Sequence, residues 1–254
     1  MTNTLNRALK SFVCISSLFL MGSALAHQVW LEPDGNQTKL YFGEFNENLR
    51  ETSPGRLDAF VKLAAQKLSG TTREDMVTTK TPDGFAIAAR LAKGESLIAQ
   101  DAAYPIRERK DGDKTERSLY VPAARLMMDT SVQIPQLTLD VVPTGKIGKT
   151  GNAANNEVEL QVFFKGQPLA KAKVAVVTAS GWMQELRSQD DGKLMVAMPW
   201  AGRYVMEVKH LDAAGERGLE KYDKANYVTS LTLQQAQGLP ALPALPAVVP
   251  SPMK

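Results

Sequence analysis

A run of short alternating segments in the C-terminal half sets the fold class of this chain. Residues 137–142 (LTLDVV) and 157–164 (EVELQVFF) alternate apolar and polar side chains, as a strand with one buried face does. Asp191-Gly192 is typical of a hairpin turn. Further strands are expected at residues 173–178, 194–198, 203–209 and 227–233. This spacing predicts an immunoglobulin-like antiparallel β-sandwich over residues 136–233.

The N-terminal half is less periodic. Strands are expected at residues 28–31, 39–43, 85–91 and 118–121. Residues 57–68 (LDAFVKLAAQKL) suit either a helix or a pair of strands, because the helix formers lack a capping box. We therefore expect a second β-rich unit over residues 27–135, which makes the whole chain all-β with two units.

The end of the chain changes character. After Gln234 the sequence has proline at every third position at first, and proline fixes φ and removes a hydrogen-bond donor. Residues 234–254 are therefore predicted to form a Pro-rich disordered tail, with a tether or a partner-binding segment as the alternative.

Residues 1–26 have the features of a cleaved signal peptide. Arg7 and Lys10 precede an apolar run at residues 12–21, which is followed by Ser-Ala-Leu-Ala at residues 23–26. The run is far shorter than the about 20 residues that cross a bilayer. The sequence therefore predicts a periplasmic protein with no membrane insertion after signal cleavage.

Cleavage after Ala26 also changes the chemistry of the mature chain. The one cysteine, Cys14, lies in the signal, so disulfides and thiolate metal sites are excluded. The formal net charge of +3 includes Arg7 and Lys10, and residues 1–26 hold no acid, so the mature charge is +3 − 2 = +1. A charge this small gives no argument for a nucleic-acid partner.

The strongest candidate for chemistry is His27, which becomes the first residue. Its α-amine and ring supply two nitrogen donors, and His210 is the only other histidine. If both meet in the fold, three nitrogens form a site that copper(II) favours and that nickel(II) can use. Asp212 lies two residues from His210, on the same strand face, as a ligand or an orienting group. The alternative is a solvated terminus and a structural histidine at a strand end.

Other groups give weaker signals. Glu32 and Glu44 are lesser candidates for a fourth metal ligand. The acids of residues 43–51, with Arg50 and Arg56, suit a cleft, although a solvated loop is favoured. Met127-Met128 contains soft copper(I) ligands, but adjacent strand residues face opposite ways, so packing is favoured.

Several short motifs resemble a known family. Residues 26–33 (AHQVWLEP) resemble the start of a periplasmic family catalogued as domain of unknown function 4198. The likeness continues through residues 41–45, 104–105, 166–169, 191–192, 201–204 and 227–232. Members are similar to the NikM and NikK type components that accompany nickel and cobalt uptake. The resemblance implies an exported β-sandwich protein that handles a transition metal, with His27 and His210 as ligands.

The leading interpretation is a non-catalytic periplasmic protein that binds copper, nickel or cobalt for uptake or delivery. Copper is the first choice, and a membrane metal transporter is the expected partner. One alternative is a copper-dependent oxidative enzyme that uses the same histidines. Another is an adhesion or interaction module without metal.

Overall fold

The computed structural model describes residues 27–149 and 156–250, and these residues form an all-β fold. Its helical turns are the short 3-10 segments η1 (Phe45–Glu47) and η2 (Arg56–Ala59). Within the described ranges, no helix has the length and hydrophobicity that a bilayer crossing requires. The predicted signal peptide at residues 1–26 lies outside the described residues.

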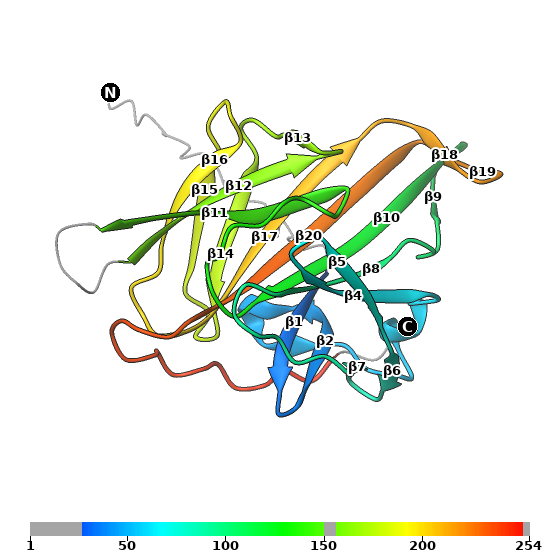
Figure 1. The fold of residues 1–254 in the computed structure, drawn as a ribbon. Helices are drawn as coiled ribbons and strands as arrows, with labels where there is room; N and C mark the ends of the chain where they lie inside the picture. Colours follow the sequence, from blue (N-terminus) through cyan, green and yellow to red (C-terminus); the bar gives the residue numbers. More distant parts are fainter. Residues whose placement is uncertain (1–26, 150–155, 251–254) are drawn as a thin grey trace, which may run out of the picture.

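Three main sheets make up the fold (Figure 1). The N-terminal sheet has the order β1 (Gln28–Asp34), β2 (Gln37–Glu44), β7 (Gly84–Ile87) and β6 (Thr78–Thr81), with β3 (Leu49–Arg50) also pairing with β2. The large sheet has the order β15 (Met183–Arg187), β14 (Lys173–Thr178), β17 (Gly202–Asp212), β20 (Lys224–Gln235), β10 (Lys114–Met127), β8 (Ser96–Asp101), β4 (Leu63–Ser69) and β5 (Thr72–Met76), with β9 (Arg107–Asp111) also pairing with β10. The third sheet contains β11 (Leu139–Lys149), β12 (Asn156–Phe164), β13 (Gln167–Pro168) and β16 (Lys193–Ala197). A separate hairpin joins β18 (Gly215–Arg217) to β19 (Glu220–Tyr222).

The large sheet is the middle layer of the molecule. Adjacent residues of β20 show this, because Ser230 donates to the main-chain oxygen of Val29 in β1 at 2.6 Å. The next side chain back, Thr229, donates to the main-chain oxygen of Leu139 in β11 at 2.8 Å. Neighbouring strand residues point to opposite faces, so β1 covers one face and β11 the other. Figure 1 shows β10, β20 and β17 running between these two outer layers.

Strands from both sides of the predicted division at residue 135 pair with each other. Strand β10 from the first half pairs in parallel with β20 from the second, from Ser118↔Lys224 to Met127↔Leu233. Buried side chains of β10 contribute to two cores: Leu126 to the core under the N-terminal sheet and Met127 to the core under the third sheet. The two predicted β-rich units therefore share one sheet.

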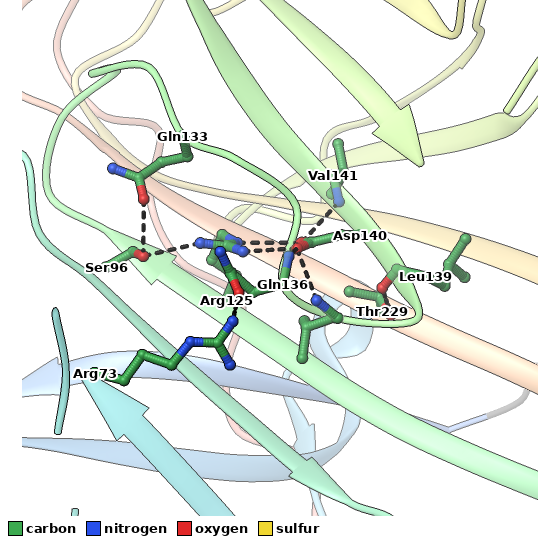
Figure 2. Close-up of polar contacts among 10 residues, drawn as sticks. Arg73, Ser96, Arg125, Gln133, Gln136, Leu139, Asp140, Val141 and Thr229 are labelled. Atoms are coloured by element: carbon green, nitrogen blue, oxygen red, sulfur yellow. Dashed lines mark hydrogen bonds and ion pairs between the residues drawn. The ribbon is translucent and has the colours of Figure 1, made fainter. Parts of the chain in front are cut away.

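A buried ion pair joins the large sheet to the third sheet (Figure 2). Arg125 in β10 donates to Asp140 in β11 through Nη2 at 2.6 Å and Nε at 3.1 Å, and both side chains are fully buried. Arg125 also donates to Ser96 at 2.8 Å. Asp140 in turn accepts main-chain N–H bonds from Gln136, Leu137 and Val141. Every charge here has partners, which a buried pair requires.

The predicted Pro-rich tail makes defined contacts in the part of the chain that the structure describes. Strand β20 continues to Gln235, and the following chain bonds to the body of the protein. The main-chain N–H groups of Leu239, Leu245 and Val248 donate to the oxygens of Pro199, Ala179 and Asn48, at 2.8, 3.0 and 3.2 Å. Residues between the prolines keep their main-chain N–H groups, so this extended segment can donate hydrogen bonds to main-chain oxygens of the rest of the protein. The segment reaches the N-terminal sheet (Figure 1).

The ambiguous segment at residues 57–68 takes neither of its two predicted forms in full. Its first residues lie in η2, and its last lie in β4, which pairs with β8 and β5. The strand predicted at residues 173–178 has the same bounds as β14.

Candidate functional site

His27 is held in place by contacts on its ring and its main chain. The ring Nε2 lies 2.5 Å from Glu51 Oε1, and the ring centroid lies 5.2 Å from that of Phe42. The hydroxyl of Tyr120 in β10 donates to the main-chain oxygen of His27. Burial raises the pKa of Tyr120 well above its usual value, which keeps this hydroxyl a donor. The predicted alternative of a solvated His27 therefore does not describe the structure, where 18% of the side chain is exposed.

Glu51 is a residue of the site that the sequence pattern does not single out. Its segment was expected to be a solvated loop, yet Glu51 is 5% exposed and also lies 3.4 Å from Arg56 Nε. The close return of β3 onto β2 brings Glu51 back to His27. Gly43 permits this return, because its φ is +148° and a Cβ there would lie 2.2 Å from the main-chain oxygen of Leu49. One glycine in β2 thus helps to place the carboxylate.

Glu44, at the end of β2, approaches the other side of the same ring. Its Oε1 lies 3.6 Å from Nδ1 of His27, which is beyond a normal hydrogen bond. Burial and the neighbouring Glu47 carboxylate raise the pKa of Glu44, and the proximity of His27 opposes that rise. The weaker sequence candidate Glu44 therefore lies at the ring, whereas Glu32 binds Arg50 and Arg203 elsewhere.

These contacts define the role of each ring nitrogen. An ionised carboxylate only accepts hydrogen bonds, so Nε2 of His27 donates to Glu51. In the neutral ring, Nδ1 then carries the lone pair and faces the oxygen of Glu44. Histidines that bind metals commonly donate their second nitrogen to a carboxylate in this way. Two donors about 2.1 Å from one ion lie about 3.0 Å apart in tetragonal geometry and about 3.4 Å apart in tetrahedral geometry, so the 3.6 Å between Nδ1 and Glu44 has to shorten when copper(II) binds.

The donors that the side chains supply are few. Among the described residues, no group of three or more His, Cys, Asp or Glu side chains is arranged as a metal site. His27 Nδ1 and Glu44 supply two donors, with Glu51 behind the ring. A metal site here therefore also needs the α-amine that cleavage before His27 would create.

The structure does not bring His210 to this site. In β17, His210 pairs with Tyr227, and its ring lies 4.2 Å from the ring of Phe164 in the third sheet. The neighbouring register positions Leu211, Asn226 and Tyr120 face the other way, toward His27. His210 borders the cleft beside His27 through its place in β17, but its ring lies on the opposite face of the large sheet.

Asp212 stays with His210. It accepts from Lys165 at 2.8 Å, which lowers the pKa of the Asp212 carboxyl. The two-residue spacing correctly puts Asp212 and His210 on one strand face. That face is covered by the third sheet, so the predicted site shared by His27, His210 and Asp212 is not assembled.

Comparison with known proteins identifies one family. Residues 24–212 match a family described as a domain of unknown function, DUF4198. The matched stretch includes His27, Glu44, Glu51 and His210. No curated protein matches this chain.

Proposed function

Because the chain belongs to the DUF4198 family, a domain of unknown function, we propose its function from the geometry around His27: it is an exported protein that binds a transition-metal ion. The ligands are the α-amine and Nδ1 of His27, together with Glu44. The role is uptake or delivery in the periplasm, without catalysis.

The observation that carries this proposal is the contact of Glu51 with His27 Nε2 at 2.5 Å. This contact fixes the orientation of the imidazole ring and favours the tautomer in which Nδ1 carries the lone pair. The Glu51 side chain that makes the contact is buried.

The donor set favours some metals over others. Nitrogen and carboxylate donors suit copper(II) first, with nickel(II) and cobalt(II) below it in the usual affinity order. Three donors leave positions open on the ion, which suits exchange with a partner better than permanent structural binding. The resemblance to NikM and NikK type components supports uptake of nickel or cobalt, with a membrane metal transporter as the partner.

The alternative of an oxidative copper enzyme is not favoured by the surroundings. The cleft beside His27 is lined by several cationic side chains rather than by a flat row of aromatic rings. We therefore propose binding rather than catalysis.

Copper titration of protein whose first residue is confirmed as His27 tests the proposal. Glu51→Gln should weaken binding about 10–100-fold, the usual effect of losing an orienting carboxylate. A methionine added before His27 should weaken it at least as much, because the amine is displaced. The matched control is His210→Gln, which removes the other imidazole and should leave the affinity unchanged.

Two results would overturn the proposal. One is equal affinity with and without the added methionine. The other is loss of binding in His210→Gln with a normal fold, which would restore the site shared by both histidines.

A further inference from the structure

The cleft beside His27 has features that metal binding does not use. Its volume is about 750 Å³, within the range of pockets that hold small molecules. Phe42, Tyr120, Leu211 and Val228 supply apolar and aromatic surface. The cationic residues along its wall are Arg56, Arg107, Arg109, Lys209 and Lys224. The one carboxylate among its lining residues is Glu116.

Three of these cations already have carboxylate partners. Arg56 lies 3.4 Å from Glu51, Lys209 lies 2.8 Å from Glu207, and Lys224 lies 2.6 Å from Glu116. The two arginines of β9 differ. Arg107 donates to the hydroxyl of Tyr104 at 2.9 Å and has no carboxylate partner among the described residues. Arg109 makes no side-chain hydrogen bond or ion pair with the part of the chain that the structure describes.

Strand geometry sets how these two guanidinium groups are presented. Arg107 and Arg109 are two residues apart, so both lie on the same face of β9, about 6.7 Å apart along the strand. Their register partners in β10, Ser118 and Glu116, also line the cleft. Arg107 donates a hydrogen bond to the hydroxyl of Tyr104, and the centroid of the Tyr104 ring lies 5.6 Å from the guanidinium carbon of Arg107. The cleft therefore presents two separate guanidinium groups, each able to bind an anion, beside an apolar surface.

We propose that this cleft binds a small organic anion with two or more carboxylates, which Arg107 and Arg109 recognise. Each guanidinium can hold one carboxylate through paired hydrogen bonds. Two carboxylates joined by a carbon skeleton can reach both guanidinium groups without bringing them together, which a single phosphate would require. The apolar surface of Phe42 and Tyr120 suits the carbon skeleton that joins the carboxylates. This site needs no metal, so it stands apart from the function proposed for His27.

Calorimetric titration of metal-free protein, dialysed until free of the EDTA used to remove the metal, tests the site, with tricarballylate as the probe and inorganic phosphate as the comparison. Tricarballylate should bind saturably, and phosphate should bind at least about tenfold more weakly. Arg109→Gln should weaken tricarballylate binding at least about tenfold, because a bidentate charged contact is lost. Lys110→Gln is the matched control: it removes the same charge from the next residue, on the opposite face of β9, and should change affinity less than about twofold.

Three results would overturn the proposal. They are no saturable binding at millimolar tricarballylate, phosphate binding as tight as tricarballylate binding, and equal loss in Arg109→Gln and Lys110→Gln. The last would indicate a general effect of net charge. Both variants alter exposed side chains, so thermal unfolding should match that of the unaltered protein. Because the metal is removed beforehand, failure here is distinct from failure of copper binding.

Discussion

At the scale of single residues, Arg125 is the charge on which the packing of two layers depends. It is fully buried and bonds to Asp140 and Ser96. Arg125→Met leaves the Asp140 carboxylate without its counter-charge, so we expect a loss of about 3–5 kcal/mol in the free energy of unfolding. Urea unfolding measures this loss. The control is Lys146→Met, which breaks an exposed pair with Glu159 and should cost at most about 1 kcal/mol. Equal losses in the two variants would contradict this account of Arg125.

His210 gives a prediction of pH dependence. Burial lowers the pKa of His210 from its ordinary 6.5, and the nearby Lys165 charge adds to this shift while Asp212 opposes it. Between the lowered pKa and 6.5 the unfolded chain binds more protons, so stability rises with pH there. The contribution is complete above pH 6.5 and is lost as the pH falls through the lowered pKa. His210→Asn should reduce the fall in unfolding free energy between pH 7 and pH 5. An unchanged fall would show that His210 is not its source.

The residues of the site show what one sequence can and cannot reveal. His27 stands out in the sequence because the predicted signal cleavage would make it the first residue, and this argument does not depend on the fold. Glu51 was not identified, because its burial arises from the close approach of β3 to β2. His210 was assigned to the wrong partners, because the alternation of β17 gives two possible faces and the sequence does not say which one meets β1.

At the scale of elements, the C-terminal segment acts as a strap between layers. Its main chain bonds to Ala179 and Asn48, and Gly181 lies against the side chain of Leu245. Removal of residues 237–254 should lower the free energy of unfolding by about 1–2 kcal/mol, since several hydrogen bonds are lost but the freed chain regains entropy. Thermal and urea unfolding of the truncated protein test this. Unchanged stability would show that the contacts of the strap contribute nothing.

Element prediction succeeded where a strand is rich in buried β-branched residues. The predicted strand at residues 173–178 coincides with β14, whose three valines are buried. It failed for edge strands such as β5 (TREDM) and β9 (RERKD), which are almost wholly polar and therefore show no hydrophobic period.

At the scale of the whole molecule, the shared sheet implies that the two halves depend on each other. Strand β20 pairs with β10 over the ten positions from Lys224 to Leu233. A fragment of residues 136–250 would expose that edge and the buried Ser230, whose hydrogen-bond partner Val29 it lacks. We expect it to aggregate or to lack cooperative unfolding, which circular dichroism and light scattering measure. A soluble fragment with a sharp unfolding transition would contradict this dependence.

The all-β class could be predicted from local alternation, but the three-layer arrangement could not. The parallel pairing of β10 and β20 joins residues more than one hundred positions apart, and no local pattern encodes it. The same pairing decides which side chains face His27. The composition of the site is therefore a consequence of long-range topology.

The central claim is that one imidazole and one amine, both from His27, bind the metal. Electron paramagnetic resonance of the copper(II) protein counts the bound nitrogens directly, provided that the first residue is His27. We predict coupling to two nitrogens, a spectrum unchanged by His210→Gln, and loss of the amine coupling when a methionine precedes His27. A spectrum with a third nitrogen that disappears in His210→Gln would contradict the account.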